Sequence, residues 1–218
     1  MAEQDVFVGD YRDASQPIET WWADAHTRKD LGWLSGTVGD TIWRSLAISS
    51  RVLPDREVLN IGVGLGTCTR DLVAAGCKVS ALDICPIALD RVRDVVQGTY
   101  LTADIDRLPD ACFDLAISHL VAQHMFDADL ETQIRHVLRA LKPGGVFAMQ
   151  FSYGWGQETS IANETLDNAK AGGVTRTLSH MVDMVDRLGG QVTRAHVIDD
   201  YPQYRTGWYA LHIAHPRI

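Results

Sequence analysis

Three glycines stand between a short apolar run and a stretch with helical spacing, and this feature restricts the fold more than any other. The segment reads Asn60-Ile-Gly62-Val-Gly64-Leu-Gly66-Thr67. The run at residues 57–61 has the character of a short β-strand, and apolar residues recur at helical intervals over residues 67–75. Glycines at such a junction let the backbone turn tightly and let a ligand approach main-chain atoms that a Cβ would block. We therefore predict that a βαβ unit begins here.

The chain beyond this turn continues the alternation of apolar runs and amphipathic stretches. Strands are predicted at residues 57–61, 78–82, 100–102, 113–118, 146–151, 191–197 and 208–213. Helices are predicted at residues 67–75, 86–96, 130–141 and 181–188. A sharp turn is expected at Lys142-Pro143-Gly144-Gly145. This order predicts an α/β fold with a Rossmann-like, mostly parallel sheet of seven strands and helices on both faces.

Residues 1–56 differ in composition from the rest and are predicted to form a helical extension before a domain at residues 57–218. The extension holds four of the six tryptophans: Trp21, Trp22, Trp33 and Trp43. Helices that bury tryptophan against the sheet would explain this composition. An aromatic lid over a substrate pocket would also explain it, because tryptophan offers a large area with a polar handle. The two interpretations are compatible.

The balance of charge excludes several classes of partner. Lys and Arg number 20 against 28 Asp and Glu, a formal net charge of −8 with neutral histidine. Such an acidic surface disfavours broad contact with phosphate backbones or anionic lipid. An apolar share of 46% with 22% charged residues excludes a disordered or fibrous chain. We expect neither a nucleic-acid nor a membrane partner, and the oligomeric state stays open, with a homodimer as one alternative.

Apolar runs, the amino terminus and the cysteines together favour the cytoplasm. No apolar run approaches the roughly 18–20 residues that a membrane span needs, and the amino terminus is acidic where a secretory signal is basic. The four cysteines form no CxxC pair, so neither a zinc site nor a redox motif is indicated. We therefore expect reduced thiols, no metal and a cytoplasmic location.

An acidic residue stands where a nucleoside ligand would need one. Asp83 lies 21 positions after Gly62, at the end of the second predicted strand, where a carboxylate can accept two hydrogen bonds from a ribose diol. A dinucleotide fingerprint would require glycine at the position of Thr67, and Arg70 is the only nearby cation for a pyrophosphate. The pattern therefore favours a nucleoside ligand without phosphates.

Residues 57–151 resemble the core of the class I S-adenosylmethionine-dependent methyltransferases. Five segments resemble motifs of that family and follow one another in its order: Val58–Gly66, Ala81–Ile84, Thr102–Ile105, Phe113–His119 and Leu138–Val146. One position departs from the family, which usually has Asp or Glu where this chain has Asn60. Asparagine brings no charge, so we expect weaker attraction for the methionine ammonium group there.

The resemblance implies S-adenosyl-L-methionine as the cofactor and S-adenosyl-L-homocysteine as its product. It places the three glycines beneath the methionine portion, Asp83 on the ribose and Asp104 on the adenine amine. Ser118 and His119 would lie near the sulfonium. The residues expected to bind the cofactor are Asn60, Gly62, Gly64, Gly66, Thr67, Asp83, Ile84, Asp104, Ile105, Ser118 and His119.

Two histidines just past the fourth predicted strand are candidates for a catalytic base. A base with a pKa near 7 suits proton removal from an acceptor, which favours histidine. His124 matches a histidine found at this place in many small-molecule members of the family, and His119 would lie close to the methyl group. Both stay candidates, with the alternative that they only shape the cleft. Candidates for the acceptor-binding wall are Trp22, Tyr153 and Trp155.

The resemblance leads to one preferred function and several alternatives. We expect an enzyme that methylates a small polar acceptor, preferably a sugar hydroxyl, because Gly207–Ile213 resembles the tail of bacterial polysaccharide-modifying members. An N-methyltransferase acting on a small amine is the nearest alternative. An RNA methyltransferase is disfavoured by the charge and by the lack of an NPPY-like tetrad at residues 118–121. An NAD-dependent oxidoreductase and a non-catalytic cofactor-binding module are the remaining alternatives.

Overall fold

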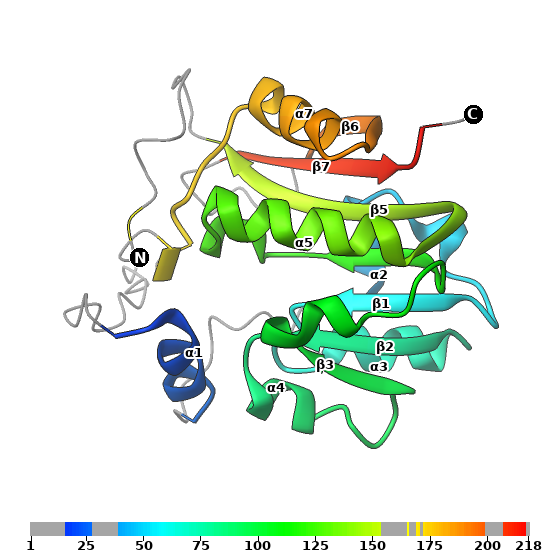
Figure 1. Ribbon diagram of the computed structural model, residues 1–218. Coiled ribbons are helices and arrows are strands. Elements are labelled where there is room, and N and C mark those ends of the chain that lie inside the picture. Colours follow the sequence, from blue (N-terminus) through cyan, green and yellow to red (C-terminus); the bar gives the residue numbers. More distant parts are fainter. Residues whose placement is uncertain are drawn as a thin grey trace, which may run out of the picture.

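A seven-stranded sheet forms the centre of the computed structural model, which describes residues 16–27, 39–153, 165, 169–170, 172–198 and 207–216 (Figure 1). The strands are β1 (Glu57–Ile61), β2 (Lys78–Asp83), β3 (Gly98–Leu101), β4 (Phe113–Ser118), β5 (Leu141–Tyr153), β6 (Gln191–Ile198) and β7 (Gly207–Ala214). Their order across the sheet is β3-β2-β1-β4-β5-β7-β6. The first five are parallel, and β7 is antiparallel to both β5 and β6. The predicted mostly parallel sheet is confirmed.

Helices cover both faces of this sheet. They are α1 (Ile18–Thr27), α2 (Gly39–Ser45), α3 (Thr67–Ala74), α4 (Pro86–Asp90), α5 (Asp127–Ala140) and α7 (Leu178–Arg187), with 3₁₀ turns η1 (Ser49–Arg51), η2 (Thr102–Arg107) and η3 (Ala122–His124). Successive side chains of a strand point to opposite faces of the sheet, so the sheet has one hydrophobic core on each face. Leu59 and Phe147 pack with α5 and α7, whereas Val58 and Ala148 pack with α2 and α3. None of the described helices is long and apolar enough to cross a bilayer.

Most elements differ from their predicted bounds by a few residues, and two differences have a clear structural cause. The helix expected over residues 86–96 ends at Asp90, because Val92 and Val95 donate to carbonyls only three residues back and continue the chain as tight turns. The turn expected at residues 142–145 lies inside β5 rather than before it. Leu141 already pairs with Phe113 of β4, and the four residues that follow form an irregularity in the register.

The segment between α2 and β1 packs into the same core as the sheet. Ile42 of α2 and Leu46, which follows that helix, are buried beside Leu72 of α3. The imidazole Nε2 atoms of His212 and His196 donate to the carbonyls of Leu46, at 2.6 Å, and of Ser45, at 2.8 Å. Residues 42–46 therefore pack as part of the same core as the sheet, while the extension at residues 1–56 as a separate unit stays a prediction.

The carboxyl ends of three central strands meet at one edge of the sheet. Ile61, the last residue of β1, pairs with Leu82 on one side and with Ser118 on the other. Asp83 and Ser118 end their own strands at this level. The glycine turn after β1, the acid at the end of β2 and the histidines after β4 are therefore brought together, as expected for ligand sites in parallel sheets.

Candidate functional site

The loop at residues 62–66 is here called the glycine loop. All three of its glycines have backbone dihedral angles in the left-handed region. Gly62, Gly64 and Gly66 have φ values of 75°, 56° and 85°. Residues with a Cβ rarely adopt this region, because the Cβ meets the following carbonyl oxygen. A Cβ added to Gly64 would meet nothing within 4 Å, so the backbone there faces open space. One added to Gly62 would overlap the side chain of Val121.

Asp83 holds the glycine loop against the end of β2. One oxygen of its carboxylate accepts from the amide of Val63 at 2.6 Å and from that of Gly64 at 3.4 Å, and the other accepts from Cys85 at 2.8 Å. Burial raises the pKa of Asp83, although these N–H donors oppose the shift. The amide of Ile84 is a further backbone donor to this carboxylate. The role of Asp83 on a ribose stays a prediction.

Two polar side chains, on the central strands β1 and β4, lie near the glycine loop. Asn60 is buried, and its amide nitrogen donates to the Thr69 hydroxyl on α3 at 2.8 Å. The residue that departs from the family pattern therefore joins β1 to the helix after the loop. Ser118 is fully buried at the end of β4, and its hydroxyl has no hydrogen-bond partner among the residues that the structure describes. Buried polar groups are normally paired, and a place for Ser118 near the sulfonium stays a prediction.

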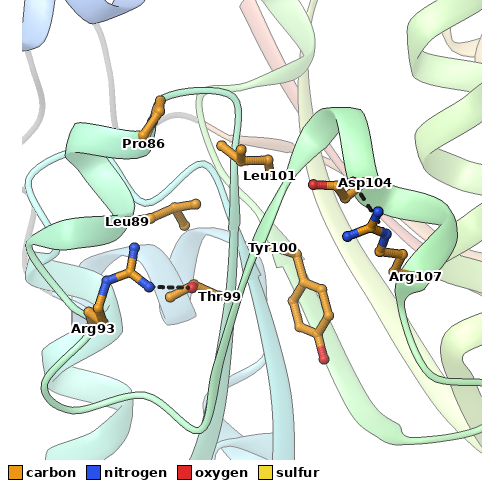
Figure 2. A pocket seen from close by; sticks show the side chains of 8 residues that line it. All are labelled: Pro86, Leu89, Arg93, Thr99, Tyr100, Leu101, Asp104 and Arg107. Carbon is orange, nitrogen blue, oxygen red and sulfur yellow. Dashed lines mark hydrogen bonds and ion pairs between the residues drawn. The ribbon is translucent and has the colours of Figure 1, made fainter.

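Asp104, one of the predicted adenine residues, lines a cavity of about 390 Å³ between α4, β3 and η2, whereas Ile84 and Ile105 are not among the lining residues (Figure 2). Asp104 lies at its rim, with an ion pair from its carboxylate to Nε of Arg107 at 3.3 Å, and Leu101 lies beside it. The Ile105 side chain is buried in the core, so only its backbone could meet a ligand. Ile84 follows Asp83 and is half-buried.

His124 lies in η3 and contacts residues far away in the chain. Its Nδ1 donates to the carbonyl of Ala169 at 2.7 Å, and its ring meets that of Trp22 on α1 edge to face, with centroids 4.9 Å apart. Burial lowers the pKa of His124 to about 4, so the ring is neutral at pH 7 and Nε2 carries the lone pair. Two predicted residues, one for catalysis and one for the acceptor wall, are thereby in contact.

The other candidate side chains lie in different surroundings. His119 directly follows Ser118, and burial lowers its pKa to about 4 as well. Tyr153, at the end of β5, pairs with Gly207 of β7, and its ring centroid lies 4.8 Å from that of Tyr209. Its contacts are those of a residue packed across the sheet, and an acceptor-binding role stays a prediction. Trp155 lies outside the described residues.

Arg176 is a residue at this site that the sequence did not indicate. It is almost fully buried, and its guanidinium donates to the carbonyls of Ala122 at 2.9 Å and Met125 at 2.7 Å, on either side of His124. Its Nε donates to the Asp127 carboxylate at 2.7 Å, which also accepts from His180. An arginine in a segment without periodicity carries no signal that it will be buried.

We expect the substitution Gly62→Ala to lower the free energy of unfolding by about 1–3 kcal/mol. The left-handed backbone costs roughly 1–2 kcal/mol for a residue with a Cβ, and overlap with Val121 adds to it. Gly144→Ala is a matched control, since Gly144 has a φ of 80° but open space around its Cβ position. Urea unfolding of both variants checks this, and a smaller loss for Gly62→Ala than for the control would contradict it.

The chain is similar in sequence to known methyltransferases. Residues 59–149 match a family model described as a methyltransferase domain. The chain is 38% identical over 108 residues to an uncharacterized methyltransferase of Synechocystis. The aligned segment covers 48% of this chain and 49% of that relative. It is 31% identical over 154 residues to a sarcosine/dimethylglycine N-methyltransferase of Halorhodospira halochloris, covering 66% of this chain and 49% of that protein.

The fold has a similar counterpart among solved structures. A SAM-dependent methyltransferase of Leishmania major superposes with a TM-score of 0.68 over 94% of this chain and 86% of that one, at 17% sequence identity. At this identity the likeness shows the fold alone, and the chain spans about half the length of the two curated relatives. The matched family model, the relatives and the sheet topology agree, and residues 59–149 therefore form a methyltransferase domain of the class I S-adenosylmethionine-dependent type.

Proposed function

We propose that this chain transfers a methyl group from S-adenosyl-L-methionine to a small polar acceptor, preferably a hydroxyl of a sugar or a related metabolite. The observation that carries the proposal is the contact of Asp83 with the glycine loop at the carboxyl ends of β1 and β2. This contact places a carboxylate beside a stretch of glycine backbone that has no side chains to block a ligand. The acceptor is proposed from the resemblance of the chain's tail, Gly207–Ile213.

The residues at the sheet edge fit the proposed cofactor. The backbone at Gly64 faces open space, and the Ser118 hydroxyl is a buried group without a partner in the described part of the chain. Asp83 and Asp104 would hold the ribose and the adenine amine, and the glycine loop would lie beneath the methionine portion. When bound, the cofactor supplies a methyl group on a sulfonium, which has a good leaving group. The chain's own task is to align the acceptor and to exclude water.

Both candidate histidines are neutral at pH 7 and can accept a proton, although burial lowers the pKa of each to about 4, below the value near 7 that was expected for the base. His124 is anchored through Nδ1 on the Ala169 carbonyl, so its Nε2 is the atom that can accept a proton. The Trp22 ring, packed against this imidazole, limits access of water to it. His119 is equally neutral and stays the other candidate for the base.

Methylation of a small amine is the second candidate function. The similarity to a sarcosine/dimethylglycine N-methyltransferase over 154 residues favours it. An amine attacks as the neutral base and loses its proton afterwards, so it depends less on a histidine than a hydroxyl does. The dependence of turnover on His124 therefore helps to separate the two.

Two measurements test the proposal. Calorimetry with S-adenosylhomocysteine and with NAD should give binding of the first and none of the second, and the reverse result would replace the methyltransferase by an oxidoreductase. Labelled S-adenosylmethionine should then be offered with panels of sugars, small amines and RNA. Label in a sugar supports the preferred acceptor, label in an amine replaces it with the second candidate, and label only in RNA contradicts both.

We expect His124→Ala to lower turnover of a hydroxyl acceptor by about 10²–10⁴-fold, the usual contribution of a general base. Affinity for S-adenosylhomocysteine should change little. Because the pKa of His124 is about 4, turnover of the unaltered chain should persist as the pH falls from 7 to 5, and an exposed histidine would lose it near 6.5. His136→Ala, on α5, is the matched control. Equal turnover of both variants would leave His124 with a packing role.

A further inference from the structure

Arg91, the first residue after α4, connects two segments that are far apart in the sequence. Its Nη1 donates to the carbonyl of Gly64 in the glycine loop at 3.2 Å. The same guanidinium donates to the carbonyl of His26 on α1 at 3.1 Å and to the Nδ1 atom of the His26 ring. One half-buried side chain therefore contacts both the candidate cofactor loop and the helix that carries Trp22.

We propose that Arg91 is a positioning residue that holds α1 against the glycine loop and thereby couples cofactor binding to the placing of Trp22 against His124. The proposal rests on the proposed function, because it assigns the glycine loop to the cofactor. It deepens that function by naming the residue through which the cofactor side and the acceptor side act together.

The geometry of α1 supports this coupling. Trp22 and His26 stand four residues apart, so they lie on neighbouring turns of one helix face, and their ring centroids are 6.1 Å apart. Trp22 contacts His124 on the acceptor side, and His26 contacts Arg91 on the cofactor side. Through these two side chains the helix contacts both halves of the candidate site, in addition to its apolar packing against α4.

Charge and helix geometry favour the same arrangement. The His26 carbonyl lies in the last turn of α1, where carbonyls lack partners within the helix and a cation is stabilised by the helix dipole. Burial and the nearby Arg91 lower the pKa of His26 to about 4, so its ring is neutral and can accept the arginine's N–H. A charged histidine would repel the guanidinium.

The glycine loop is held from two sides as a consequence. The amide of Gly64 donates to Asp83 at 3.4 Å, while its carbonyl accepts from Arg91. The Arg91 backbone is also held in place, because its carbonyl accepts a hydrogen bond from Arg70. Arg70 in turn forms an ion pair with Asp94. Loss of the Arg91 side chain should therefore loosen α1 and the glycine loop together.

The test measures hydrogen exchange of the α1 amides and calorimetric affinity for S-adenosylhomocysteine in the full chain. Arg91→Met removes the donors but keeps the aliphatic length, and Arg91→Lys keeps one charge with fewer donors in reach. Arg187→Met is the matched control, because Arg187 is an exposed arginine on α7 that pairs with Glu131. The double variant with His26→Ala shows whether the two residues act through one contact.

We expect Arg91→Met to speed exchange over residues 18–27 by about tenfold without ligand and to weaken S-adenosylhomocysteine binding by about tenfold, in line with loss of a charged hydrogen bond. Arg91→Lys should recover part of both effects, and Arg187→Met should show neither. Adding His26→Ala to Arg91→Met should have little further effect. Unchanged α1 exchange in Arg91→Met, or ligand affinity equal to that of the unaltered chain, overturns the inference.

The two proposals fail in different ways. If the unaltered chain does not bind S-adenosylhomocysteine, the proposed function fails, and the exchange of α1 without ligand still decides whether Arg91 holds the helix. If the unaltered chain binds and Arg91→Met still shows ligand-induced protection of α1, only the coupling through Arg91 fails.

Discussion

Replacing Arg176 with methionine is expected to lower the free energy of unfolding by about 3–5 kcal/mol, the usual cost of breaking a buried charge pair. The substitution leaves the Asp127 carboxylate without its guanidinium partner and the carbonyls of Ala122 and Met125 without their donor. These two carbonyls flank His124, so the η3 turn should loosen around the imidazole. The effect should therefore reach the candidate site and not only the stability.

Two readouts separate loss of the network from general unfolding. Urea unfolding gives the stability change, with Arg187→Met as an exposed-arginine control that should cost at most about 1 kcal/mol. Nuclear magnetic resonance titration gives the pKa of His124, which should rise from about 4 toward its ordinary value as burial is lost. If Arg176→Met does not fold, His180→Ala removes one partner of Asp127 and should shift the same pKa less. An unchanged pKa of His124 in a folded variant would contradict the assigned role.

The second large effect is expected from Asp83→Ala, which should lower S-adenosylhomocysteine affinity by more than about 100-fold. The predicted hydrogen bonds from the ribose hydroxyls would be lost, and the glycine loop would lose the acceptor that holds the amide of Val63. Val63 and Cys85 would both be left with unpaired N–H groups, each of which costs about 1–3 kcal/mol of folding free energy. The free energy of unfolding should fall as well, because the glycine loop loses its attachment to β2.

The design for Asp83 includes a near-isosteric variant and a surface control. Asp83→Asn keeps one oxygen acceptor but turns an N–H₂ group toward a donor, so it should recover only part of the stability. Asp94→Ala removes an exposed carboxylate that pairs with Arg70, and its effect on unfolding should stay within about 1 kcal/mol. Calorimetry and urea unfolding give the two numbers. Full affinity in Asp83→Ala would exclude this carboxylate from the cofactor site.

Most of the fold could be predicted because sheet periodicity is a local property. The strand at residues 113–118 and the helix that ends near residue 140 carry their hydrophobic pattern in their own sequence, and both lie where the pattern places them. The errors fell where tertiary contacts override local pattern. Valines at helical spacing continued past Asp90, yet the chain there forms tight turns with Val92 buried against β2.

The glycine loop and Asp83 could be predicted because one βαβ unit contains both of them. Parallel pairing of β1 with β2 places the two strand ends together, whatever the rest of the chain does. The partners of the candidate histidine had no such signal. Arg176 lies 49 residues from Asp127, and His180 lies 53 residues from it, in a segment without a motif. The cytoplasmic location stays a prediction, and the oligomeric state stays undecided.

The sequence alone therefore determined the order of the strands and helices and the loop with its carboxylate, since these depend on residue spacing and on the backbone freedom of glycine. Tertiary structure decided which distant side chains complete the site: Trp22 and Ala169 against His124, Arg91 between α1 and the loop, and Arg176 beneath η3. Such contacts arise from packing of segments that share no local pattern, because a hydrogen bond between side chains depends on position in space and not on separation along the chain.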